Sequence, residues 1–220
     1  MQLLFRHANF LTTVARLADL PRESLREVAF AGRSNAGKSS AINTLCGRTR
    51  LAHVSRTPGR TQHLNYFTVA PDTLGKYFVD LPGYGFAKAP EAVRREWKGL
   101  VGPYLLERAT LAGLILIMDC RRPLTELDQR LLAWFLPTGR PVHLLLSKSD
   151  KLSRQARTLA LRQVRAALTP HTPQCSVQLF SSLKKEGINE CETILRHWLE
   201  LPGERPPATK PPHIAPLPGV

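Results

Sequence analysis

Nine consecutive residues constrain this chain of 220 residues more than any others, and they spell GRSNAGKSS. They are Gly32, Arg33, Ser34, Asn35, Ala36, Gly37, Lys38, Ser39 and Ser40. The spacing G-x-x-x-x-G-K-S is typical of a loop that wraps phosphate groups, in which the lysine reaches the β- and γ-phosphates and the next hydroxyl binds Mg²⁺. Residues 25–31 end in an apolar run that suits a strand, and residues 39–45 can form a helix. This context favours phosphate binding over a chance match in an ordinary turn, because a helix N-terminus presents backbone N–H groups to an anion.

The composition indicates one globular domain with a polyanionic partner. Hydrophobic residues make up 43% of the chain and charged residues 22%, which are globular values. The net charge of +14 favours RNA, DNA or an anionic membrane surface as partner, and charge alone does not choose among them. The four cysteines are scattered without metal-ligand spacing, which favours reduced thiols and a cytosolic protein. The apolar runs are too short to span a bilayer.

Hydrophobic periodicity predicts alternating strands and helices after the phosphate loop. The expected strands are residues 28–31, 64–69, 77–81, 113–118, 141–146 and 175–180. The expected helices are residues 39–46, 90–108, 125–136, 153–168 and 188–199. Residues 47–62 are rich in arginine and show no period, which predicts a loop.

The two ends of the chain differ from the region between them. Residues 1–26 form an N-terminal extension, in which the apolar residues Phe5, Phe10, Leu11, Val14 and Leu17 fit a helical face that docks on the domain. Residues 27–201 form the main domain. Residues 202–220 are rich in proline, which predicts a disordered or polyproline-like tail.

A second motif follows the strand 77–81. Asp80 is followed by Leu81, Pro82 and Gly83, which gives D-x-x-G. A carboxylate at a strand end near the phosphate loop suits Mg²⁺, held directly or through water. Gly83 frees a backbone N–H that can approach a γ-phosphate. D-x-x-G is common by chance, but its place one strand downstream of the phosphate loop favours function.

A third motif, Ser147-Lys148-Ser149-Asp150, follows the strand 141–146, at the edge of an α/β sheet where ligands bind. The Asp150 carboxylate can accept hydrogen bonds from both N–H groups of a guanine edge, whereas adenine has no matching pair of donors. The alternative is a capping role before the next helix. One side of that helix carries Arg154, Arg157, Arg162 and Arg165, which suits either solvated surface or an RNA-facing one.

The order and wording of the motifs resemble one known family. The strings EVAFAGRSNAGKSS, TPGRTQ, DLPGYGFA, SKSDKL and FSSLKKEG together look like the EngB (YihA/YsxC) family of bacterial ribosome-biogenesis GTPases, over residues 8–200. The resemblance implies an α/β P-loop GTPase domain with a six-stranded, mostly parallel sheet and helices on both faces. It implies GTP and GDP as ligands, Mg²⁺ as cofactor, and slow GTP hydrolysis that a ribosomal particle stimulates. It also implies binding to the large ribosomal subunit and its rRNA, and a link to cell division and septation. We therefore expect a cytoplasmic monomer without membrane attachment.

The resemblance also implies roles for individual residues. Beyond the phosphate loop, the nucleotide-binding residues would be Gly59, Arg60, Thr61, Asp80, Leu81, Pro82, Gly83, Ser147, Lys148, Ser149, Asp150, Phe180, Ser181 and Ser182. The catalytic residues would be Lys38, Thr61 and Gly83. The Mg²⁺ ligands would be Ser39, Thr61 and Asp80, the last directly or through water. Asn35 lies where related GTPases bind K⁺, which makes K⁺ a candidate second cofactor.

Two positions depart from the family pattern. Ser147 stands where Asn or Thr is usual, but its hydroxyl can still bond the phosphate loop. Tyr84 stands where Ras-like enzymes have a glutamine that orients water, so we expect slow intrinsic hydrolysis. An alternative function is an RNA-binding assembly module with nucleotide as a structural ligand. A third, an ATP-dependent kinase or ATPase, is opposed by Lys148 and Asp150.

Overall fold

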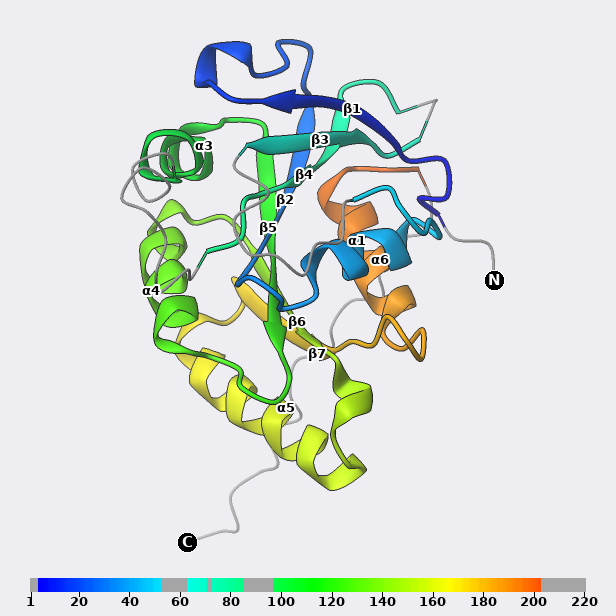
Figure 1. Cartoon of the computed structure of the whole chain (residues 1–220). Coiled ribbons are helices and arrows are strands. Elements are labelled where there is room, and N and C mark those ends of the chain that lie inside the picture. Colours follow the sequence, from blue (N-terminus) through cyan, green and yellow to red (C-terminus); the bar gives the residue numbers. More distant parts are fainter. Residues whose placement is uncertain (1–3, 53–62, 71–72, 85–96, 203–220) are drawn as a thin grey trace, which may run out of the picture.

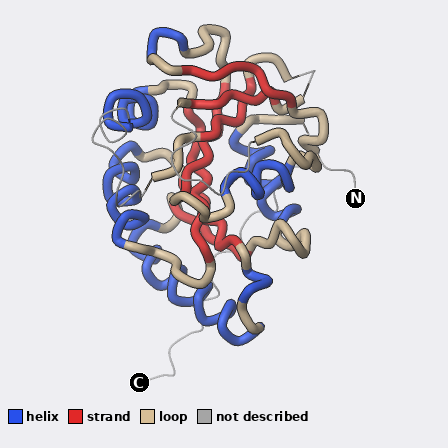
Figure 2. Tube along the Cα trace, viewed as in Figure 1, coloured by secondary structure: helices blue, strands red, loops and turns tan. Residues whose placement is uncertain are grey.

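The computed structural model of the chain describes residues 4–52, 63–70, 73–84 and 97–202. These residues form one sheet with helices on both faces (Figures 1 and 2). The strands are β1 (Asn9–Val14), β2 (Arg26–Gly32), β3 (Leu64–Thr68), β4 (Lys76–Asp80), β5 (Leu111–Asp119), β6 (Val142–Ser147) and β7 (Cys175–Leu179). The helices are α1 (Lys38–Leu45), α3 (Gly102–Glu107), α4 (Glu126–Phe135), α5 (Arg154–Leu168) and α6 (Ile188–Trp198). None of the helices in this part of the chain is long and apolar enough to cross a membrane.

The strand order is β1-β3-β4-β2-β5-β6-β7. Strands β4, β2, β5, β6 and β7 pair in parallel, whereas β3 is antiparallel to both β1 and β4. The parallel strands therefore end at the same edge of the sheet, which is where α/β folds bind ligands. The predicted α/β class with a mostly parallel sheet is confirmed, and the sheet has seven strands rather than the expected six.

The additional strand is β1, so the prediction of a helix in the N-terminal extension was wrong. The apolar residues at positions 10, 14 and 17 mimic a helical period, but Asn9–Val14 pairs with β3 instead. Thr12, Thr13 and Val14 are β-branched and favour an extended backbone. The periodicity of the sequence does not show that β3 has an edge available for pairing. Pairing with that edge is what makes Asn9–Val14 a strand.

The core has two layers, one on each face of the sheet. Helices α3, α4 and α5 cover one face, and α1 and α6 cover the other (Figure 1). Phe135 and Val164 are buried in the first layer, and Ile42 and Leu195 in the second. Phe5 belongs to the second layer, where its ring centroid lies 4.8 Å from that of Phe78.

The predicted helix 90–108 is confirmed where the structure describes it, with a change of helix type after Val101. Of the expected helix 90–108, residues 90–96 lie outside the described part. The remainder is a π-helical turn (Trp97–Val101) that runs into α3. Helix α3 accommodates the expected interruption at Pro103, because proline is tolerated in the first turn of a helix. Short 3₁₀ turns occur at Leu17–Asp19, Leu136–Thr138, Ser149–Lys151 and Thr169–His171.

Candidate functional site

The phosphate loop connects β2 to α1 at the carboxyl edge of the sheet, as predicted. Gly32 ends β2, and a Cβ atom there would lie 2.8 Å from the Ile117 carbonyl oxygen. Gly37 has φ +100°, in the left-handed region, and directly precedes α1. Both glycines are therefore required by the backbone path of the loop. The helix N-terminus and the loop N–H groups form the kind of site that attracts an anion.

Lys38 and Asp80 form a buried ion pair beside this loop. The Lys38 ammonium group donates to a carboxylate oxygen of Asp80, which ends β4. The two residues are 8% and 2% exposed, so water screens the pair weakly. Burial raises the pKa of Asp80, and the charge of Lys38 opposes that rise. The D-x-x-G carboxylate is thus placed against the lysine of the phosphate loop.

The oxygen donors at this position suit Mg²⁺. Ser39 follows Lys38 in the first turn of α1, and the Asp80 carboxylate contacts Lys38. Mg²⁺ takes hard oxygen ligands and is commonly held by one or two protein groups together with substrate phosphates and water. Within the described ranges there is no cluster of three His, Cys, Asp or Glu side chains able to hold a metal alone. The donor set therefore fits an ion that a nucleotide would help to bind.

The segment after Asp80 pairs with the phosphate loop. The Ser34 N–H donates to the Tyr84 carbonyl oxygen at 3.1 Å, and the Tyr84 N–H lies 3.4 Å from the Gly32 carbonyl oxygen. A Cβ atom at Gly83 would lie 3.3 Å from the Ser34 hydroxyl oxygen, so the two backbones pass close together. The segment after Asp80 is therefore held directly against the phosphate loop.

The Tyr84 side chain reaches α4. Its hydroxyl donates to a carboxylate oxygen of Asp128 at 2.6 Å. The other oxygen of Asp128 accepts from the Thr125 N–H at 2.8 Å and from the Thr125 hydroxyl at 2.7 Å, at the start of α4. Burial and the negative charge of Asp128 raise the pKa of Tyr84.

The segment 147–150 follows β6 and bonds directly to the phosphate loop. The Ser147 hydroxyl donates to the Ala36 carbonyl oxygen, which confirms the predicted contact. The Lys148 ammonium group donates to the Asn35 carbonyl oxygen at 2.5 Å. Lys148 has φ +58° and Asn35 has φ +63°, so both residues adopt the left-handed conformation. The two motifs therefore form one continuous surface.

Asp150 lies on the same edge and is held by the next strand connection. Its Oδ1 atom accepts a hydrogen bond of 2.6 Å from the Ser181 hydroxyl. The capping alternative for Asp150 is not supported, because Ser153 caps α5 by accepting from the Ala156 N–H at 3.2 Å. The Asp150 Oδ2 atom lies 3.8 Å from the Lys151 ammonium nitrogen, and the Asp150 side chain is 6% exposed.

The residues after β7 are placed beside this motif mainly through their backbones. The Phe180 ring is fully buried in the core. The Phe180 N–H donates to the Leu146 carbonyl oxygen at 2.9 Å, and its carbonyl oxygen accepts from the Ser149 N–H at 3.2 Å. Ser181 is buried and Ser182 is partly exposed. Gly59, Arg60 and Thr61 lie outside the described residues.

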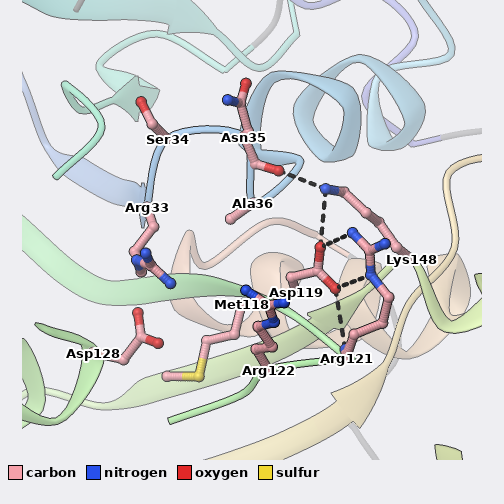
Figure 3. A pocket seen from close by; sticks show the side chains of 10 residues that line it. All are labelled: Arg33, Ser34, Asn35, Ala36, Met118, Asp119, Arg121, Arg122, Asp128 and Lys148. Carbon is pink, nitrogen blue, oxygen red and sulfur yellow. Dashed lines mark hydrogen bonds and ion pairs between the residues drawn. The ribbon is translucent and has the colours of Figure 1, made fainter. Parts of the chain in front are cut away.

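A pocket of about 450 Å³ lies between the phosphate loop and the end of β5 (Figure 3). Its lining residues are Arg33, Ser34, Asn35, Ala36, Met118, Asp119, Arg121, Arg122, Asp128 and Lys148. Burial would raise the pKa of Asp119, but hydrogen bonds from Arg121 and Lys148 lower it below its usual range. Lys148 lies 3.0 Å from Asp119, so this carboxylate helps to orient the lysine toward the phosphate loop.

Five of the lining residues were not predicted from the sequence, namely Met118, Asp119, Arg121, Arg122 and Asp128. Asp119 carried a usable signal, because it ends the apolar run of β5 at the carboxyl edge. Asp128 carried none, since it stands within a helix and reaches the site through Tyr84.

Residues 27–148 match the sequence pattern of a family described as "50S ribosome-binding GTPase". The chain is 68% identical over 200 residues to the probable GTP-binding protein EngB of Dechloromonas aromatica, covering 90% of each chain. It is 56% identical over 197 residues to the protein of the same name from Nitrosomonas europaea, covering 90% of this chain and 87% of the relative.

Two solved structures have the same fold. A probable GTP-binding protein engB superposes with a TM-score of 0.61 at 18% identity, covering 79% of this chain and 98% of that one. Era, in complex with MgGDPNP and nucleotides 1506–1542 of 16S ribosomal RNA, superposes with a TM-score of 0.60 at 21% identity, covering 84% of this chain and 59% of that one.

Together, the fold, the phosphate loop and these matches define a P-loop GTPase. The sequence matches narrow this class further, since they extend over nine-tenths of the chain. The chain belongs to the EngB family of GTP-binding proteins, which confirms the resemblance seen in the sequence.

Proposed function

We propose that this GTPase binds GTP and GDP at the carboxyl edge of its sheet and acts as a slow switch in assembly of the large ribosomal subunit. The observation that carries the proposal is the hydrogen bond from Lys148 to the Asn35 carbonyl oxygen. It joins the segment suited to a base directly to the loop suited to phosphates. A nucleotide would therefore contact both segments at once.

Guanine selection is assigned to Asp150. Its carboxylate would accept from the N1–H and the 2-amino group of guanine, and the Ser181 hydroxyl holds one of its oxygens at 2.6 Å. Adenine would leave the carboxylate without a matching pair of donors, which is costly in a partly desolvated site. Lys148 would cover the base with its aliphatic chain while its ammonium group bonds the loop.

Phosphate binding is assigned to residues 32–40. Lys38 would leave Asp80 and contact the β- and γ-phosphates, and the loop N–H groups would bind the remaining oxygens. Mg²⁺, when bound, would neutralise negative charge on the phosphate oxygens. The residues that would hold it are Ser39 and Asp80, together with Thr61 in the GTP state.

Hydrolysis would proceed by in-line attack of water on the γ-phosphorus. The bond from the γ-phosphorus to the bridging oxygen breaks, and GDP and inorganic phosphate form. Lys38 and the Gly83 N–H would stabilise charge on the transferred group. Tyr84 cannot orient the water as a glutamine would, because its hydroxyl bonds to Asp128. This arrangement supports slow intrinsic turnover and an accelerating partner.

The switch would operate through the contact between Gly83 and Ser34. Gly83 lies against the phosphate loop, and Tyr84 connects this segment to α4. GTP would draw Gly83 and Thr61 toward the γ-phosphate, and hydrolysis would release them.

The large ribosomal subunit is proposed as partner on two grounds. The family description names the 50S particle, and the net charge of +14 suits rRNA. The four cysteines are buried free thiols, which fits the proposed cytoplasmic location. We further propose that the free protein is a monomer, which light scattering would check.

The deciding experiment measures GTP hydrolysis with and without purified large subunits, in potassium and in sodium. We expect the subunits to accelerate hydrolysis and excess ATP not to compete. Unchanged turnover with subunits would favour an RNA-binding module that holds nucleotide as a structural ligand. A faster rate in potassium, lost in Asn35→Gly, would support K⁺ at Asn35. Glycine is the suitable replacement because Asn35 has φ +63°.

A further inference from the structure

Glu186 lies in the connection between β7 and α6 and joins three segments of the chain. Its Oε2 atom accepts from the Ser149 hydroxyl at 3.0 Å. Arg157 of α5 donates from Nη1 to both carboxylate oxygens, each at 2.9 Å. The Glu186 backbone exchanges two hydrogen bonds of 3.1 Å with Ser181. One residue thus contacts both segments proposed to bind the base, and α5 holds it in place.

These bonds leave Asp150 little freedom. The Ser181 hydroxyl accepts from the Lys184 N–H at 3.0 Å, so its single O–H is directed to Asp150. The backbone bonds to Glu186 close the turn that contains Ser181 and Lys184. The backbone bonds of Glu186 persist whatever its side chain is, so the Glu186 side chain can affect the Asp150 carboxylate only through Ser149, the residue next to it.

The electrostatics of this cluster require Arg157. Glu186 and Asp150 are both acidic and both bond to the same turn. Arg157 supplies the positive charge beside Glu186, and the Lys151 ammonium nitrogen lies 3.8 Å from Asp150. The Glu186 and Arg157 side chains are 36% and 30% exposed, which is low enough for charge-assisted hydrogen bonds to order them. Removing either partner leaves the other without its counter-charge.

We propose that Glu186, held by Arg157, is a positioning residue that fixes the Asp150 carboxylate and thereby sets the preference for guanine over hypoxanthine. The inference rests on the proposed guanine site. Hypoxanthine keeps N1–H and O6 but lacks the 2-amino group, so it does not benefit from a carboxylate aligned with two donors. A carboxylate that is free to turn loses the contact to the 2-amino group first.

The test compares the affinities of GDP and IDP for the full chain by calorimetry. We expect Glu186→Ala to lower the ratio of GDP affinity to IDP affinity about tenfold, mainly through weaker GDP binding. The matched control is Glu190→Ala, which removes an exposed glutamate from the first turn of α6. The control should leave the ratio unchanged. An equal loss of GDP and IDP affinity in Glu186→Ala would overturn the proposal.

Two more variants separate positioning from a general loss of structure. Arg157→Ala should lower the same ratio, and the double variant should be no worse than Glu186→Ala, because the residues act as one unit. Glu186→Gln keeps an acceptor oxygen and should recover part of the ratio. These two variants decide the matter if Glu186→Ala does not fold, and an unchanged ratio in both would overturn the proposal. A wild-type protein that binds ADP as well as GDP would instead refute the proposed guanine site itself.

Discussion

The Lys38 ammonium group and the Asp80 carboxylate contact each other inside the phosphate-binding region, where both side chains are buried. Each group has a second partner in the proposed GTP complex, namely the phosphates for Lys38 and Mg²⁺ for Asp80. The ion pair compensates two charges that would be costly to bury alone. In the proposed complex it would compete with nucleotide binding.

Asp80→Asn should separate the effect of the ion pair on phosphate binding from the contribution of Asp80 to Mg²⁺ binding. Without the carboxylate, Lys38 is free for phosphate, so GDP affinity in the presence of a chelator should rise about fivefold. The gain in affinity on adding Mg²⁺ should largely disappear, because an amide is a poor Mg²⁺ ligand. Calorimetry with and without Mg²⁺ measures both quantities.

Ser39→Ala is the matched variant for this experiment. It should reduce the Mg²⁺-dependent gain but leave affinity in chelator unchanged, since the hydroxyl makes no ion pair with Lys38. A full Mg²⁺-dependent gain in Asp80→Asn would contradict the assignment of Asp80.

Asp150→Asn should change the base that the protein prefers. The amide replaces one acceptor by a donor, so GTP should bind about 100-fold more weakly. Xanthosine triphosphate carries a carbonyl where guanine has the 2-amino group, so its affinity should increase. Competition of the two nucleotides gives the ratio. Asp19→Asn, an exposed aspartate outside the site, serves as control. Unchanged preference for GTP would rule out Asp150 as the base-selecting residue.

The sequence predicted the parts of this site that depend on local pattern. The phosphate loop, Asp80 and Asp150 each lie at the end of a strand or just after it, and short-range spacing identifies them. Contacts between distant segments were not predictable in the same way. Tyr84 bonds to Asp128 across 44 positions, and nothing near either residue indicates the pairing. The proposed role of Glu186 could not be predicted from the sequence for the same reason, because it depends on Arg157, which is 29 positions away.

The fold also has parts that local sequence pattern predicts and parts that depend on contacts between distant segments. The central strands are apolar runs that are buried on both faces, so composition alone places them. Strand β1 was missed because its state depends on an available edge at β3 rather than on its own pattern. Gly37 is the opposite case, because its φ of +100° requires the glycine that the motif places there. Gly32 is needed because the Ile117 carbonyl of β5 lies against it, and the motif does not show that contact.

The buried imidazole of His143 should make stability depend on pH. Its Nδ1 lies 2.7 Å from the Ser176 hydroxyl and its Nε2 lies 2.8 Å from Gln178 Oε1, which fits the neutral ring. Burial lowers the pKa of His143 to about 4. The unfolded chain binds a proton below its usual pKa of about 6.5, so stability should fall as pH falls from 6.5 to 4. The full loss is about 3 kcal/mol.

The free energy of unfolding, measured with denaturant at pH 7 and at pH 4.5, tests the prediction for His143. His143→Gln keeps polar contacts without a titrating ring, so its stability should change less between the two pH values than that of the wild type. His197→Gln, on the exposed side of α6, corrects for other groups that titrate in this range. The same pH dependence in all three proteins would show that His143 is not responsible.

The final prediction concerns the face of α5 that is proposed to meet rRNA. This helix of 15 residues contains no Asp or Glu. Arg157 is engaged with Glu186, whereas Arg154, Arg162 and Arg165 are exposed and lie within an arc of about 80° around the helix. Replacing these three arginines by glutamine should reduce the slope of log affinity against log salt for large subunits by about two to three. GTP affinity of the free protein should not change, since none of the three lies at the nucleotide site.

The matched control replaces Arg6, Arg16 and Arg22, three exposed arginines of the N-terminal segment around β1, and removes the same total charge. Sedimentation with purified subunits at several salt concentrations gives both slopes. If the two triple variants behave alike, net charge rather than the α5 face governs binding.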